Sequence, residues 1–94
     1  MNYVEIYQSL QASAQRTLQL LKEKIIPEAE AMLADESQKA EALPSSPEWQ
    51  KMTLKEQLQA TRVAKMLVKN AESNLFKAKR AHARLKKTVE EHYS

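Results

Sequence analysis

The 94-residue chain contains no glycine, no cysteine and only three prolines. Glycine supplies the positive-φ positions of tight hairpin turns and the close backbone approach of phosphate-binding loops. Its absence therefore excludes glycine-dependent nucleotide motifs and argues against a sheet-rich fold. The absence of cysteine excludes disulfides, thiol chemistry and cysteine-ligated metal sites. The residues that dominate instead are Ala, Gln, Leu, Lys and Glu, which are strong helix formers, so the composition predicts an all-α fold.

Aromatic residues and long apolar runs are also scarce. One Phe, one Trp and three Tyr leave the core to aliphatic side chains, and a chain of this size buries little of them in two long helices. We therefore expect a partner protein or further copies of the chain to complete the core. No apolar run approaches the ~20 residues that span a bilayer, and Met1–Glu5 lacks the features of a signal peptide. We expect a soluble cytoplasmic protein, with signal-less export left open.

The first half of the chain has helical periodicity. Asn2 followed by Glu5 fits a capping pair at the start of a helix. Apolar positions then recur in steps of three and four, at Tyr3, Tyr7, Leu10, Ala14, Thr17 and Leu21, with Leu18 and Ile25 alongside. Pro27 removes a backbone hydrogen bond and clashes with the preceding turn. Because the spacing resumes beyond it, we expect a kinked but continuous helix over about residues 3–40.

Residues 41–47 are the one convincing loop in the sequence. Pro44 and Pro47 bracket two serines, and Ser45–Glu48 reads as a capping box with proline in the first turn of the next helix. Thr53–Glu56 is a second capping box, so the main helix has two candidate starts. The second arm then spans about residues 48–92 without proline, along the seam Leu54, Leu58, Thr61, Ala64, Val68, Ala71, Leu75, Ala78, His82, Leu85 and Val89.

Two helical arms joined by one short loop predict a long, coiled-coil-like antiparallel helical hairpin that forms a single domain over residues 1–94. The polar segment Asn70–Asn74 could interrupt the second arm. We expect that arm to be continuous, with the alternative that bends at Pro27 and near Asn70 divide the hairpin into three or four helices.

Charge is strongly segregated along the second arm. Between residues 62 and 87 the chain has nine Lys or Arg residues and one acid, Glu72, a net charge of +8. Residues 1–61 have a net charge of −3, and their acids cluster at residues 28–48. At about 100° per residue, most of these bases fall on the side of the helix opposite the seam. The candidate partner-binding residues are Arg62, Lys65, Lys69, Phe76, Lys77, Arg80, Arg84 and Lys87.

The plainest interpretation of this basic face is the solvated side of an amphipathic helix. A solvated face normally mixes both signs of charge, however, and this one has almost no acids. Phe76 lies within the basic sector, with Leu58 and Met66 on the same general side of the helix. These three apolar side chains suggest a second contact stripe for a further helix.

The sequence shows no chemistry of catalysis or metal binding. His82 and His92 are ten residues apart, whereas helical metal-binding pairs are three or four apart. No nucleophile, base and oxyanion donor are predicted to converge. We therefore expect no enzyme activity, no cofactor, no metal site and no small-molecule substrate.

The sequence favours a non-enzymatic protein–protein interaction module, such as an adaptor, small chaperone, inhibitor or structural subunit. Its basic helix would bind an acidic or helical surface on a protein partner or on another copy. The alternative is a nucleic-acid-binding protein that contacts the phosphate backbone.

A third interpretation rests on two short segments. Pro44-Ser45-Ser46-Pro47 and Asn70-Ala71-Glu72-Ser73-Asn74 resemble the Pro-x-x-Pro turn and the Asn-containing polar patch of helical-hairpin subunits of bacterial type III secretion needles. The resemblance covers about ten residues, and the C-terminal arm is more basic than in that family. It implies a subunit of a bacterial secretion apparatus.

Overall fold

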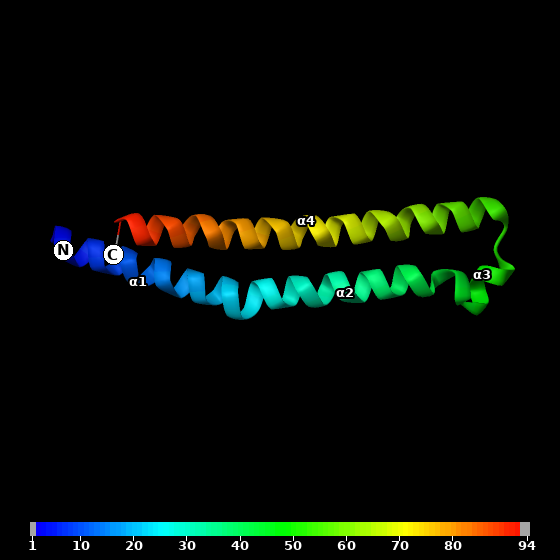
Figure 1. Cartoon of the computed structure of the whole chain (residues 1–94), viewed down its shortest axis with the longest axis horizontal. Coiled ribbons are helices and arrows are strands. Elements are labelled where there is room, and N and C mark those ends of the chain that lie inside the picture. The colour runs from blue at the N-terminus through cyan, green and yellow to red at the C-terminus, as the bar shows by residue number, and fades with distance from the viewer. Residues whose placement is uncertain (1, 93–94) are drawn as a thin grey trace. The chain divides into compact units, whose positions relative to one another are not determined.

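The computed structural model describes residues 2–92, and every secondary-structure element in that range is a helix. The helices are α1 (Tyr3–Leu20), a π-helical turn η1 (Leu21–Ile25), α2 (Ile26–Ala42), a 3₁₀ turn η2 (Leu43–Ser45), α3 (Pro47–Lys51) and α4 (Leu54–His92). The fold is an all-α helical hairpin, as the composition and the two apolar seams predicted. Figure 1 shows the order of these elements along the chain.

The chain divides into two units, each of which pairs a segment from the first half with a segment of α4. Unit 1 comprises Met1–Glu28 and Phe76–Ser94, and unit 2 comprises Ala29–Leu75. In unit 1 the hydroxyl of Tyr7 donates a hydrogen bond to the backbone carbonyl of His92, which links α1 to the end of α4. Unit 2 contains the turn of the hairpin.

The first arm is helical without interruption from residue 3 to residue 45, so the predicted continuity through Pro27 is confirmed. The π-helical turn η1 lies directly before this proline. There the backbone N–H of Ile26 donates to the carbonyl of Leu21, five residues back. Pro27 has no N–H to donate, and a wider turn accommodates its ring where a regular α-turn would clash. The predicted bend is therefore a one-turn widening of the helix.

The predicted seam of the first arm was wrong in part. The inward positions in unit 1 are Gln11, Ala14, Leu18, Leu21 and Ile26, a series that contains one step of five residues. Tyr3, Tyr7, Leu10, Thr17 and Ile25, which were predicted on the seam, are exposed. The extra residue in the π turn changes the helical phase by about 100° and moves the inward position from Ile25 to Ile26. Before the π turn the steps of three and four hold, but Gln11 and Leu18 take the inward positions instead of their neighbours Leu10 and Thr17.

The turn of the hairpin is more helical than predicted. Glu41 and Ala42 complete α2, and residues 43–45 form a 3₁₀ turn, so the loop expected at 41–47 was wrong in most of its length. Ser46 is the N-cap of α3: its hydroxyl accepts from the backbone N–H of Trp49 (3.3 Å) and donates to the carbonyl of Leu43 (2.8 Å). Pro47 occupies the first turn of α3, as predicted.

A helix begins near each candidate start of the second arm, but the first is capped by Ser46 and not by Ser45 as the capping-box pattern predicted. After α3, Thr53 begins α4 with a closed capping box, in which its hydroxyl accepts from the N–H of Glu56 (3.2 Å) and the carboxylate of Glu56 accepts from the N–H of Thr53 (3.3 Å). Helix α4 then continues for 39 residues, through Asn70–Asn74, without a break. Leu54 and Leu58, predicted on the seam, are exposed. Gln57 takes the inward position and donates to the carbonyl of Trp49 (2.9 Å).

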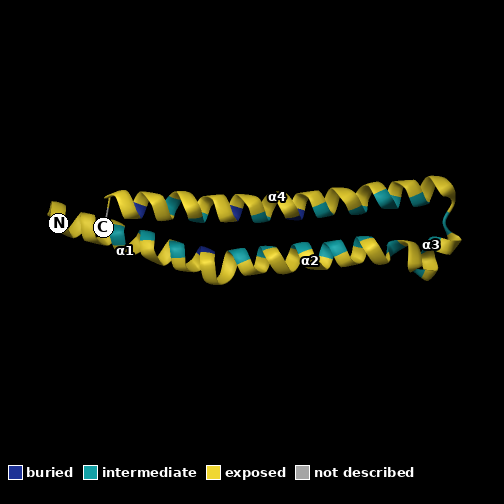
Figure 2. Ribbon diagram, viewed as in Figure 1, coloured by how far each residue is buried: buried dark blue, intermediate teal, exposed yellow. Residues whose placement is uncertain are grey.

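Within the described residues the core is thin. Only Leu21, Ala78 and Val89 of unit 1 and Ala71 of unit 2 are buried, and fourteen large apolar side chains are exposed. Figure 2 shows exposed residues over most of every helix. Two of the four buried residues are alanines, whose small side chains let paired helix backbones approach closely while burying little apolar area.

Candidate functional site: the basic surface of α4

The eight predicted contact residues are all exposed and all lie on α4. Three of them, Arg62, Lys65 and Lys69, belong to unit 2, and the other five belong to unit 1. The two groups are therefore described separately, each against the helix that packs beside it.

In unit 1 the bases form a stripe at helical spacing. Lys77, Arg80, Arg84 and Lys87 follow one another in steps of three, four and three residues, which keeps them on one side of α4. The inward residues of the same segment are Ala78, His82, Leu85 and Val89. Their mean direction differs from that of the bases by about 150°. Packing against α1 therefore leaves the basic side chains in solvent.

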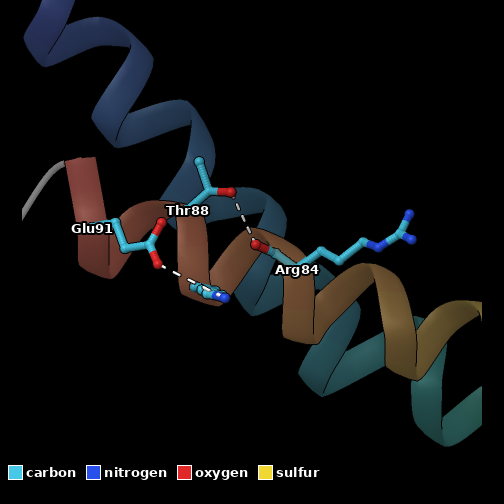
Figure 3. Close-up of polar contacts among 4 residues, drawn as sticks. Arg84, Thr88 and Glu91 are labelled. Atoms are coloured by element: carbon cyan, nitrogen blue, oxygen red, sulfur yellow. Dashed lines mark hydrogen bonds and ion pairs between the residues drawn. The ribbon is translucent and has the colours of Figure 1, made fainter.

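The basic stripe of unit 1 has almost no acidic partner of its own. Of the four bases in this stripe, only Lys87 forms an ion pair with a described residue, a long contact of 3.9 Å with Glu91, and both side chains are largely exposed. Figure 3 shows this pair together with the hydroxyl of Thr88, which donates to the carbonyl of Arg84 (3.0 Å). The guanidinium of Arg84 extends away from the helix in that view. An exposed pair of this length contributes little to stability.

Phe76 adjoins this stripe with 63% of its surface exposed. An aromatic ring beside arginines is the composition that dominates binding energy in protein interfaces. Residues 76–87 contain six Lys or Arg and no acid. This part of unit 1 therefore combines an exposed aromatic side chain with a cluster of positively charged side chains.

In unit 2, Arg62, Lys65 and Lys69 also follow steps of three and four residues, and none of them forms an ion pair within the described chain. Leu58 lies beside them: it lines a shallow hollow with Thr61, Arg62 and Lys65. Leu58 and Met66 are 61% and 54% exposed, respectively. Met66 and Phe76 are exposed, as predicted, and Leu58, which the sequence placed both on the seam and near the basic side, is exposed as well.

The described residues contain no group of three or more His, Cys, Asp or Glu side chains positioned to hold a metal ion. His82 is half-buried and lines an open hollow of about 440 Å³ in unit 1, with Lys22 and Lys86 at its edge. Within residues 2–92, no helix combines the length and the apolarity that a membrane span requires.

Comparison with known proteins gives no match: neither a family model, a curated protein nor a solved structure is similar to the chain.

Proposed function

We propose that the protein is a non-enzymatic interaction module whose α4 helix binds an acidic surface on a protein partner. The observation that carries this proposal is the unpaired basic stripe of unit 1. Lys77, Arg80 and Arg84 are exposed and have no acidic partner among the described residues. Because like charges on one helix face repel one another, an acidic ligand relieves that repulsion as it binds.

Phe76 supports a protein as the partner. Buried aromatic and arginine side chains supply most of the energy of protein interfaces, and Phe76 is exposed next to Lys77 and Arg80. Binding to single-stranded nucleic acid usually needs several aromatic side chains on which bases stack. The basic segment of α4 offers only Phe76. Binding to a phosphate backbone is therefore the second candidate, and the test below separates the two.

If the chain is a secretion-needle subunit, as the resemblance implies, its protein partners would include further copies of the same subunit. The resemblance rests on the segments 44–47 and 70–74, and it remains a resemblance because no family model matches the chain.

The test is affinity capture from a cell extract with the purified protein, performed with and without nuclease. Arg80→Glu/Arg84→Glu is compared with wild type, and Lys51→Glu/Lys55→Glu is the matched control, because it makes the same charge change at exposed positions of unit 2. We expect nuclease-resistant protein capture that the first variant loses and the control keeps.

Capture that nuclease abolishes would show a nucleic-acid ligand instead. Equal capture by wild type and Arg80→Glu/Arg84→Glu would return the stripe to a solvated helix face.

A further inference from the structure

A groove in unit 2 lies between the two arms of the hairpin, away from the basic residues. Its volume is about 360 Å³. Helix α4 lines one side with Ala60, Val63, Ala64 and Leu67, and the other side is formed by Glu36, Lys39, Ala40 and Leu43. At 100° per residue, Arg62, Lys65 and Lys69 point to the opposite side of α4 from the lining residues. The groove is therefore a surface separate from Arg62, Lys65 and Lys69, the bases of α4 in unit 2.

The lining of α4 has the pattern of a helix-docking site. Its four residues are spaced i, i+3, i+4 and i+7, which places them on one face. Val63 and Leu67 are 41% and 45% exposed, so their side chains are only partly covered by α2. Ala60 and Ala64 on this side and Ala40 on the other leave room for the backbone of another helix to approach closely.

The α2 side of the groove is chemically self-complementary. Glu36, Lys39 and Leu43 line the groove, and Met32, one turn before Glu36, extends the same helix face beyond it with 57% of its surface exposed. These four residues follow steps of four, three and four and so form one stripe. The stripe reads apolar, acidic, basic, apolar in one direction. A second copy of this stripe can be laid antiparallel on the first, with the midpoint between Glu36 and Lys39 aligned. Each apolar residue then faces an apolar residue of the other copy, and each charged residue faces one of opposite charge.

This order is what a two-fold axis requires, because an isologous contact pairs residue i with residue j and residue j with residue i. Two copies packed antiparallel through this stripe would place Met32 against the partner copy's Leu43, and Glu36 against the partner copy's Lys39. Lys39 already pairs with Asp35 at 2.9 Å. Its ammonium group has three N–H donors and can donate a hydrogen bond to a second carboxylate, that of the partner copy.

We propose that this groove is the contact surface between two copies of the chain, related by a two-fold axis that passes between Glu36 and Lys39. The dimer buries Val63, Leu67 and Met32, which the isolated unit leaves exposed. It uses none of the basic residues to which the function is assigned, so either proposal can fail without the other.

Sedimentation equilibrium over a range of concentrations tests the dimer. Leu67→Glu places a charge in the groove, whereas Leu58→Glu makes the same change at an exposed position of α4 on the side of Arg62 and Lys65. We expect wild type and Leu58→Glu to dimerise and Leu67→Glu to dimerise at least tenfold more weakly. A wild-type monomer at about 1 mM, or equal dimerisation of the two variants, would overturn the proposal.

A charge swap tests the two-fold pairing itself. Glu36→Lys alone and Lys39→Glu alone each create like-charge pairs across the axis, so each should weaken the dimer several-fold. The double variant Glu36→Lys/Lys39→Glu restores opposite pairs and should recover most of the affinity, with helicity checked by circular dichroism. Failure of the double variant to recover beyond either single variant would contradict the antiparallel register.

Disulfide trapping gives a readout that does not depend on weakened binding. Because the chain has no cysteine, single-cysteine variants report one contact each. Met32→Cys and Leu43→Cys should form a mixed disulfide dimer readily when combined under oxidation, and each variant alone should cross-link slowly. Preferential homodimer formation by either variant, or no mixed product, would rule out the proposed axis.

Discussion

The two units contain parts of the same long helix but differ in what they bury and what they expose. Unit 1 buries Leu21, Ala78 and Val89, and it has nine Lys or Arg against five acids, a net charge of +4. Among the described residues of unit 2 only Ala71 is buried, and six bases against seven acids give a net charge of −1. Unit 1 therefore presents a charged surface beside the helix pair that buries more residues. Unit 2 presents an open apolar groove.

This difference separates two kinds of contact. A surface of one charge sign attracts a partner over a distance and weakens with salt. A groove lined by small and aliphatic residues contributes mainly by burying apolar area, which salt affects less.

The largest expected effect follows from the single buried residue of unit 2. Ala71→Asp buries an unpaired carboxylate at a position that is 4% exposed, and we expect a loss of roughly 3 kcal/mol in the free energy of unfolding. Asn70→Asp adds the same charge at an exposed neighbour and should cost less than about 0.5 kcal/mol. Urea denaturation followed by circular dichroism compares them. Equal midpoints would show that unit 2 has no core at Ala71.

The π turn of unit 1 provides the next test. Pro27→Ala restores a backbone N–H and removes the ring that the wider turn accommodates. We expect the thermal midpoint to rise, with a gain of about 1–2 kcal/mol, below the full ~3 kcal/mol cost of an interior proline because the π turn already relieves part of it. A lower midpoint would mean that packing against α4, rather than the proline, requires the wide turn.

The turn of unit 2 depends on a smaller interaction. Ser46→Ala removes the hydroxyl that caps α3 and bonds the carbonyl of Leu43, so it should cost about 1 kcal/mol. Ser45→Ala, a change at the exposed neighbour, is the control. Chemical denaturation measures both variants. A larger loss for Ser45→Ala would move the cap to the position that the capping-box pattern first suggested.

The smallest expected effect concerns the one shifted pKa of unit 2. The hydrogen bond that the Lys39 ammonium donates to the carboxylate of Asp35, together with the charges of Asp35 and Glu36, raises the pKa of Lys39 above its ordinary value of 10.5. A raised pKa stabilises the fold below pH 10.5, and the effect is lost as the pH rises through the folded-state value. Asp35→Asn should therefore narrow the difference in stability between pH 8 and pH 11 only slightly, because both side chains are exposed.

Local signals in the sequence predicted most of the fold. The capping pairs at Asn2 and Thr53 are present as hydrogen bonds, and the absence of Gly and Pro after Pro47 matches the continuous α4. The inward positions of α4 from Thr61 to Val89 also follow the predicted seam. These features are determined by residues close together in the sequence, so a local sequence pattern is enough to predict them.

The phase of the first arm could not be predicted in the same way. Pro27 indicates a distortion, but the sequence does not show whether the helix bends or takes up one extra residue in a single turn. The structure gains one, and the inward position moves from Ile25 to Ile26. The groove was missed for a related reason. Val63 and Leu67 lie on the flank of the α4 seam, and their role depends on where α2 packs.

The exposure of the candidate contact residues was predictable, because bases placed away from an apolar seam stay in solvent. Their division between two units was not. It depends on which residues of the first arm pack against each part of α4.

The salt dependence of partner binding tests the central claim most directly. The affinity of wild type and of Arg80→Glu/Arg84→Glu for the captured partner is measured between roughly 50 and 500 mM salt. We predict that at low salt wild type binds the partner at least about fivefold more tightly than Arg80→Glu/Arg84→Glu does, a difference of roughly 1 kcal/mol. The affinities of the two proteins should converge as the salt concentration rises. Equal affinities at every salt concentration would contradict a functional role for the basic stripe of unit 1.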